Sequence, residues 1–320
     1  MYKYNIYYIK LYNYSAMKTI IEGYVKKLID NVPPNPTGKT KVIDIILDGG
    51  IFNGSYQIGG LYFLKELENQ YKIKINKFSC CSVGALCALV YYINRLDLAI
   101  DFYDCAVTNF KKNKQLDFLH SWIDNVLAPL LPEDIYINAT NKIYICYYNV
   151  KKKKKIIRQT YKSNKELLEC IKRSTFIPYF INGDALLDKR YIDGINPNIF
   201  KCEPGKKILY IDLLGIDKIA HAFSIKNEKT NFHRILAGIL DIHLFFIKQS
   251  NTQMCSYVND WSLYCWSKNK IIKHLIEKLI VYCLALYIYL KKYIPEQLKD
   301  CLMSKICGNV FGLVIEHYCV

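Results

Sequence analysis

Short apolar runs alternate with amphipathic segments over the first two thirds of the chain. Runs rich in β-branched residues at Val42 to Leu47, Ile73 to Ser79 and Lys207 to Leu214 have the length and composition of buried strands. Apolar positions at helical spacing follow at Tyr56 to Tyr71, and small apolar residues at Ala85 to Ile93 suit a buried helix. Strands that alternate with helices predict an α/β fold, a three-layer sandwich with a mostly parallel central sheet between helices.

Further elements of both kinds are expected around this core. The patterns predict helices at Met17 to Asn31, Asp97 to Phe118, Leu119 to Leu131 and Asn164 to Ser174, and strands at Ile143 to Val150, Ile156 to Tyr161 and Tyr191 to Gly194. Pro33 to Gly38 has the composition of a stiff linker. Met17 precedes the first helical pattern and is an alternative start of the protein.

The chain divides into three predicted parts: an extension over residues 1–40, a main domain over 41–215, and a mainly helical region over 216–320 that packs on the domain or contacts a membrane. In the last part, Ile235 to Ile247 and Ile271 to Leu290 are apolar and helical. Only the stretch Leu279 to Leu290 lacks a charge. Its length is well short of the roughly 20 apolar residues that span a bilayer. Its tyrosines and the following Lys291 and Lys292 are typical of a helix at a membrane–water interface.

The chain carries a net charge of +16, mostly from lysine, which suggests an anionic partner such as nucleic acid or a membrane surface. Scarce arginine disfavours base-specific readout, and the abundant aromatic residues are not interleaved with a basic motif, so nucleic acid is not expected. Lys151 to Lys155 form a charged run at a predicted hairpin tip. Such a run is typical of a solvated turn that resists edge pairing, and alternatively of contact with anionic lipid.

The 13 cysteines indicate a reducing compartment, because their number is odd and no C-x-x-C pair recurs. The first residues lack a clean apolar signal, so we expect an intracellular, cytoplasmic protein, peripheral to membranes and not secreted. The Lys-, Ile-, Tyr- and Asn-rich composition is typical of an AT-rich genome, and a viral protein of this kind would act in the host-cell cytoplasm. The histidines are scattered, so neither a metal nor another cofactor is expected.

A glycine-rich loop, Asp48 to Gly54, joins the first predicted strand to the helix that follows it. Backbone N–H groups in such a loop can hold an anion. The loop lacks the G-K-[ST] ending of a phosphate-binding loop, and its glycines are not spaced as in a dinucleotide-binding fingerprint. A bound nucleotide is therefore disfavoured.

Ser82 lies between a predicted strand and a predicted helix, with Gly84 two residues later, which is the layout of a nucleophile elbow. Cys80 stands where the G-x-S-x-G pattern has its first glycine. A serine that caps a helix would give the same local pattern. The neighbouring Cys81 is interpreted as a packing residue, because its side chain would point to the opposite side of the strand.

No histidine falls in an obvious turn after a strand, and His221, His233 and His243 lie in the poorly patterned last part of the chain. Asp193 and Gly194 do follow a short predicted strand. Aspartate in this position is often only a turn-former, so the pair alone does not identify a base.

Three motifs in order, Asp48 to Gly54, Ser82 to Gly84, and Asp193 with Gly194, resemble those of the patatin-like phospholipase family. Gly54 to Glu68 is similar to the helix after that family's glycine loop. Ser174 to Phe180 is similar to its apolar segment before the catalytic aspartate. The resemblance covers the predicted main domain only.

The resemblance implies a Ser–Asp dyad hydrolase in which Ser82 attacks an ester carbonyl and Asp193 acts as base without a histidine. The backbone N–H groups of Gly49, Gly50 and Ile51 would form the oxyanion hole. Residues that would support the loop and the elbow are Asp48, Asn53, Gly54, Cys80, Gly84 and Gly194. The implied substrates are acyl esters of lipids, chiefly phospholipids at an anionic membrane surface, and the bond cleavage itself would need no metal.

The chain departs from the family's pattern at four positions, one of which is Ile195, where a second small residue usually follows Asp193 and Gly194. Ile51 replaces a third glycine, and a β-branched residue does not easily adopt a positive φ. Asn53 replaces an arginine or lysine, which removes a positive charge near the developing oxyanion, and Cys80 replaces the elbow's first glycine. Two hypotheses follow: an active lipid acyl hydrolase, or a catalytically impaired patatin-fold protein that binds membranes or other proteins.

Overall fold

The fold is taken from a computed structural model, which describes residues 18–34, 40–113, 115–213, 224–226, 228, 230–291 and 293. Outside these ranges lie Met17, most of the Pro33 to Gly38 linker, Leu214, His221, Lys292 and residues 294–320. A helix over residues 18–29 confirms the first predicted element.

A mixed sheet forms the centre of the described chain and has seven strands there, in the order β4-β3-β2-β1-β6-β7, with β5 paired to β3. Its four middle strands are parallel: β3 (Ile143–Asn149), β2 (Ile73–Cys81), β1 (Lys41–Leu47) and β6 (Lys207–Ile211). The other three pair antiparallel: β4 (Lys154–Arg158), β5 (Tyr191–Asp193) and β7 (Cys255–Tyr257). The predicted α/β fold with a mostly parallel central sheet is confirmed.

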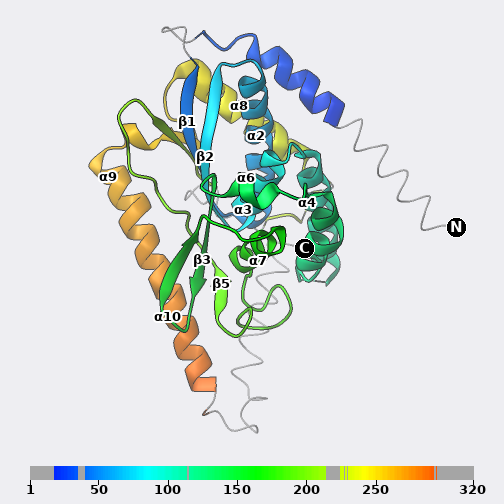
Figure 1. Cartoon of the computed structure of the whole chain (residues 1–320), viewed down its shortest axis with the longest axis vertical. Coiled ribbons are helices and arrows are strands. Elements are labelled where there is room, and N and C mark those ends of the chain that lie inside the picture. The colour runs from blue at the N-terminus through cyan, green and yellow to red at the C-terminus, as the bar shows by residue number, and fades with distance from the viewer. Residues whose placement is uncertain are drawn as a thin grey trace, which may run out of the picture.

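Helices lie on both faces of this sheet (Figure 1). One side holds α2 (Gly54–Asn69), α3 (Val83–Tyr92), α4 (Asp97–Asn113), α5 (Phe118–Trp122), α7 (Asn164–Ser174) and α8 (Phe232–Lys248). The other side holds α9 (Leu263–Trp266) and α10 (Lys273–Lys291). The short α6 (Ile135–Ala139) precedes β3.

Side-chain alternation along β1 explains the three layers. Ile43 and Ile45 pack into the large core beneath α2 and α3, whereas Ile46 points to the opposite face and packs with Tyr210 and Trp261. Because successive residues of a strand face opposite sides, one apolar strand supplies both cores.

The elements β7 and α8, which follow residue 215 in the described part of the chain, are built into the same sheet and core. Strand β7 pairs with β6, and α8 crosses α2 at glycine contacts. A Cβ atom on Gly59 would lie 2.0 Å from the carbonyl oxygen of Ile235, and one on Gly238 would lie 1.9 Å from that of Tyr56. The two helix backbones therefore touch directly.

The helical region predicted over Leu119 to Leu131 is present, in an irregular form. Leu119 to Leu131 is not a single helix, because α5 continues into a π-helical turn (Ile123–Leu127) and a 3-10 turn (Ala128–Leu130). Pro129 lies at the start of that 3-10 turn, where it cannot donate a backbone hydrogen bond.

In the described part of the chain, none of the helices has the length and apolar character required to cross a membrane.

Candidate active site

Ser82 is the single residue between β2 and α3, and it holds an unusual backbone conformation with φ 52° and ψ −134°. Its N–H donates to Ser174 Oγ at 2.8 Å, and that hydroxyl donates to the carbonyl oxygen of Cys146 at 2.6 Å. The Ser82 side chain makes no capping hydrogen bond to α3. Ser82 thus stands at the N-cap position of α3 without capping it through its side chain, and its geometry is that of a strained strand-to-helix turn.

Small side chains allow this turn to lie against its neighbours. A Cβ atom on Gly84 would be 2.8 Å from the carbonyl oxygen of Leu47 and 2.9 Å from that of Asp48, so α3 begins in contact with the end of β1. Cys80 is fully buried, with its sulfur 3.4 Å from the carbonyl oxygen of Tyr144. A small residue at position 80 fits this space.

Asp193 ends β5, which pairs with β3 next to the strand that leads to Ser82. Its carboxyl contacts the Ser82 side chain, and its Oδ1 accepts the N–H of Ile195 at 2.8 Å. Gly194 allows the chain to turn here, because a Cβ atom would lie 2.2 Å from the carbonyl oxygen of Cys146. The structure thus brings together Ser82 and Asp193, which lie on different elements.

Burial raises the pKa of the Asp193 carboxyl to about 6. Hydrogen bonds from Ser82 and from the backbone of Ile195 oppose this rise, as does the charge of Lys155, while the charge of Asp48 adds to it. A carboxylate with this pKa is ionised at neutral pH and is a better proton acceptor than an exposed aspartate.

The glycine loop lies beside Ser82. A Cβ atom on Gly49 would be 2.9 Å from Ser82 Cβ, but the N–H of Gly49 donates to Asp48 Oδ1 at 3.0 Å. The loop then forms a 3-10 turn (Ile51–Asn53). In this turn the N–H of Asn53 donates to the carbonyl oxygen of Gly50 at 2.8 Å. The first N–H groups of such a turn, here those of Gly50 and Ile51, are not used by its own hydrogen bonds.

Ile51 has φ 48°, so the expectation that a β-branched residue would avoid a positive φ in this loop is wrong. Gly54, the first residue of α2, packs against the Tyr103 ring, where a Cβ atom would lie 1.5 Å from the hydroxyl. The loop is thereby confined between α4 and the sheet.

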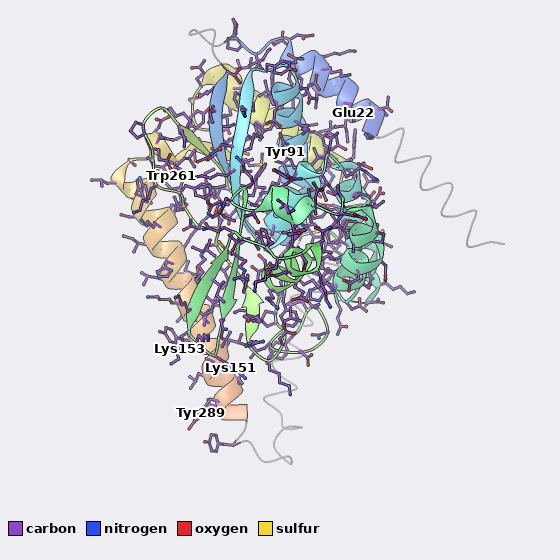
Figure 2. The ribbon with its side chains drawn as sticks, in the orientation of Figure 1. Glu22, Tyr91, Lys151, Lys153, Trp261 and Tyr289 are labelled. Atoms are coloured by element: carbon purple, nitrogen blue, oxygen red, sulfur yellow. The ribbon has the colours of Figure 1, made fainter. Side chains whose placement is uncertain are left out.

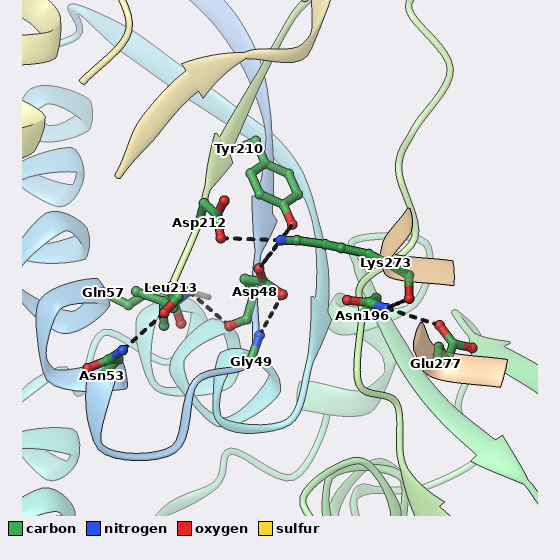
Figure 3. A network of polar contacts seen from close by, with 10 residues as sticks. All are labelled: Asp48, Gly49, Asn53, Gln57, Asn196, Tyr210, Asp212, Leu213, Lys273 and Glu277. Atoms are coloured by element: carbon green, nitrogen blue, oxygen red, sulfur yellow. Dashed lines mark hydrogen bonds and ion pairs between the residues drawn. The ribbon is translucent and has the colours of Figure 1, made fainter. Parts of the chain in front are cut away.

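A buried ion pair holds the base of the loop (Figure 3). Asp48 Oδ2 accepts the hydroxyl of Tyr210 at 3.0 Å and the ammonium of Lys273 at 2.8 Å. Lys273 also donates to Tyr210 at 2.9 Å and to Asp212 at 3.2 Å. Burial lowers the pKa of Lys273, but the neighbouring negative charges outweigh it and leave the pKa above its ordinary value.

The helix that carries Lys273 is fixed by a second set of polar contacts (Figure 3). Asn196 donates to the carbonyl oxygen of Lys273 at 2.9 Å and to Glu277 Oε2 at 3.3 Å. Lys155 pairs with Glu277 at 2.7 Å, so this lysine departs from the expected exposed run. Sequence analysis missed these contacts, because Lys273 was only a charged interruption in an apolar helix.

A positively charged side chain, that of Arg234, lies beside Asn53. Arg234 of α8 is 1% exposed and donates from Nη1 to Asn53 Oδ1 at 2.8 Å, while Asn53 Nδ2 donates to the carbonyl oxygen of Leu213 at 3.0 Å. Glu228 pairs with Arg234 at 2.6 Å and offsets its charge. The guanidinium of Arg234 therefore lies beside position 53, with its charge offset by Glu228.

An apolar pocket opens beside Ser82, between the glycine loop, α3, α4 and α5. Hydrocarbon side chains form most of its wall, among them Phe52, Leu86, Ala106, Leu116, Leu119 and Ile177. A second small apolar cavity shares Phe52, Leu116 and Ile177 and extends toward Phe110 and Phe180. The walls of both cavities are therefore mostly apolar.

Other candidate nucleophiles and bases have no comparable setting. Burial raises the pKa values of the Cys80 and Cys81 thiols well above their ordinary range, which keeps both protonated. His233 is exposed beside Glu228, and His243 packs against Phe63. Within the described ranges, no three His, Cys, Asp or Glu side chains are grouped so that they would hold a metal ion.

No protein-family model matches the chain. A search of curated proteins finds similarity to the omega-hydroxyceramide transacylase of Mus musculus, with 25% identity over 162 residues. These residues are 47% of this chain and 26% of the mouse protein, so the chain spans about a quarter of that relative's length. The chain is thus distantly similar, over part of its length, to a protein named for acyl transfer.

Proposed function

We propose that this protein is a lipid acyl hydrolase or transacylase in which Ser82 is the nucleophile and Asp193 the base. The observation that carries the proposal is the conformation of Ser82. Ser82 has φ 52° and makes no side-chain capping bond, and a hydrogen bond from Ser82 opposes the rise in the pKa of the Asp193 carboxyl, which supports the pair. The partial likeness to a transacylase supports acyl chemistry on lipids.

In the first half of the proposed reaction, Ser82 Oγ attacks the ester carbonyl carbon while its proton passes to the Asp193 carboxylate. The carbonyl oxygen becomes an oxyanion, which the N–H groups of Gly50 and Ile51 would stabilise. We assign no role of this kind to Gly49, because its N–H is donated to Asp48. Val83 N–H, at the start of α3, is a further donor.

Collapse of the tetrahedral intermediate breaks the bond to the alcohol oxygen, which takes the proton back from Asp193. The acyl group is then esterified to Ser82. In the second half, water or an acceptor alcohol gives its proton to Asp193 and attacks the acyl carbon, and the proton returns to Ser82 Oγ. Water yields a fatty acid, whereas an alcohol such as a hydroxylated lipid yields a new ester.

The apolar pocket beside Ser82 suits the hydrocarbon chain of the acyl group. Its wall is formed by Phe52, Leu86 and Ala106 together with other apolar residues. Each methylene that moves from water into such a pocket contributes roughly 0.8 kcal/mol to binding. Phospholipid esters are the substrates that we propose first.

Two measurements test the proposal. A fluorophosphonate probe should label wild-type protein at Ser82 and leave Ser82→Ala unlabelled. Fatty-acid release from phospholipid vesicles should fall about 10³-fold or more in Ser82→Ala and in Asp193→Asn, because each removes one member of a functional unit. Addition of a long-chain alcohol separates hydrolysis from acyl transfer by its products. Undiminished release from Ser82→Ala would exclude Ser82 as the nucleophile.

The alternative is a catalytically impaired protein that keeps this fold and binds lipid or protein. Two observations favour it: the N–H of Gly49 is occupied by Asp48, and Ile51 holds a positive φ. Absence of probe labelling in a folded sample would support this alternative. Labelling at Ser82 would dismiss it.

A further inference from the structure

Helix α10 has one face that packs on the protein and one face that is apolar and open to solvent. Lys273, Glu277 and Val281 lie along the packed face. The opposite face exposes about half or more of each of several large apolar side chains, namely Leu275, Ile276, Leu279, Tyr282, Leu286 and Tyr289. At helical spacing these residues form one continuous surface, here called the α10 face.

Such an apolar surface is uncommon on a protein that remains in water. Single exposed apolar residues are ordinary, but contiguous patches mark binding surfaces. The side chains of the α10 face include tyrosines, which prefer the boundary between water and hydrocarbon. The face therefore fits a partner whose interior is apolar and whose surface is polar.

The turn between β3 and β4 adds positive charge beside this face. Lys151, Lys152, Lys153 and Lys154 are all exposed there, and Lys153 Nζ lies 5.5 Å from the ring centre of Tyr282. Figure 2 shows Lys151 and Lys153 next to α10, with Tyr289 further along the helix. An apolar face that adjoins a cluster of lysines is complementary to an anionic membrane surface.

The geometry points to the α10 face and the four lysines as one docking surface for anionic lipid. The same helix carries Lys273, which binds Asp48 of the glycine loop, and Glu277, which binds Lys155. The N-terminal end of the helix that carries the α10 face is thus joined to the glycine loop. This inference rests on the proposed function only in that the substrate is a membrane lipid, because docking itself needs no catalysis.

Vesicle co-sedimentation in the Ser82→Ala background tests docking without turnover. Vesicles of phosphatidylcholine with phosphatidylserine should bind the protein more tightly than phosphatidylcholine alone. Leu279 is 63% exposed, so Leu279→Glu should keep the fold yet weaken binding about tenfold or more. Ile137→Glu is the matched control, because Ile137 is 59% exposed on α6 and should leave binding unchanged.

The charge contribution is tested separately. Lys151→Gln with Lys152→Gln should weaken binding to anionic vesicles about fivefold for each lysine and reduce its dependence on salt. Lys26→Gln with Lys27→Gln removes the same charge from exposed positions of the first helix and should have a much smaller effect.

Unchanged vesicle binding by Leu279→Glu would overturn the inference. So would a wild-type dimer that ignores vesicles and becomes monomeric in Leu279→Glu, because a second copy would then be the occupant. Hydrolysis of a short, water-soluble ester distinguishes the two proposals. If vesicle binding fails while the soluble ester is still hydrolysed, the proposed function stands and the docking surface is rejected. If the protein binds vesicles but hydrolyses no ester, the docking surface stands and the proposed function is rejected.

Discussion

At the scale of single residues, two residues near the proposed oxyanion site have backbone conformations that are unfavourable for any residue other than glycine. Ser82 and Ile51 have φ values of 52° and 48°. Such conformations cost about 1–3 kcal/mol each and persist only where neighbouring contacts impose them. For Ser82 these contacts include the hydrogen bond to Ser174 and the packing of Gly84 against β1. Two of the described non-glycine residues with positive φ thus lie where the chemistry is proposed.

The pKa of Asp193 predicts how activity depends on pH. Because burial raises this pKa to about 6, the carboxylate needed as base is lost as the pH falls through about 6. We therefore expect the rate with a soluble ester to be half-maximal near this pH and level above it. A rate that stays constant down to the ordinary pKa of an exposed aspartate would contradict the assignment.

The same pKa predicts an effect on stability. The native carboxyl holds its proton up to about pH 6, whereas the unfolded one loses it near 3.8, so native protein loses stability as the pH rises across this window. Asp193→Asn removes this loss. The difference in unfolding free energy, Asp193→Asn minus wild type, should therefore be larger at pH 7 than at pH 4, by up to about 3 kcal/mol. Urea titrations measure this change, and the exposed Asp30→Asn should show little of it.

Asn53 is bonded to a residue that is distant in the sequence. Asn53→Leu would leave Arg234 Nη1 and the carbonyl oxygen of Leu213 without their bonds in a buried site. Because each unpaired group costs about 1–3 kcal/mol, we expect unfolding free energy to fall by about 2–4 kcal/mol. Chemical denaturation checks this value. Asn69→Leu is the control, since Asn69 bonds Glu66 on an exposed surface where water replaces the lost partner.

At the scale of elements, local patterns predicted what local interactions determine. Helix α7 begins at Asn164 and ends at Ser174 as expected, because the Ser163 side chain caps it and its apolar positions are regular. Strand β1, the glycine loop and α2 also follow their sequence pattern. The contacts of Lys273 with Asp48 and of Arg234 with Asn53 join residues 225 and 181 positions apart, and no local pattern encodes them. The strand β7 was also not predicted.

Helix α10 should contribute to the site through Lys273. Lys273→Met leaves Asp48 buried without its cation, which typically costs about 3–5 kcal/mol. We expect lower unfolding free energy and slower hydrolysis of a soluble ester, because Asp48 also holds the N–H of Gly49. Adding Asp48→Asn should restore much of the stability, since no uncompensated charge remains. A double variant as unstable as Lys273→Met would show that the loss is one of packing.

At the scale of the whole molecule, β7 and α8, which follow residue 215 in the described part of the chain, belong to the same packed structure as the rest of the sheet. Strand β7 extends the sheet, and α8 packs on α2 with their backbones in contact. Because neither part buries its apolar face without the other, we expect one cooperative unfolding transition.

The glycine crossing of α2 and α8 provides the test. Gly238→Ala places a Cβ atom 1.9 Å from the carbonyl oxygen of Tyr56, so it should lower the unfolding free energy by at least about 1–3 kcal/mol. Gly23→Ala is the control: nothing lies within 4 Å of its new Cβ atom, and it should be neutral or stabilising. In a Trp122→Phe background, fluorescence reports Trp261 and Trp266, while circular dichroism reports all helices. The two signals should share one midpoint and shift together in Gly238→Ala, whereas separate midpoints would mean that the two parts unfold independently.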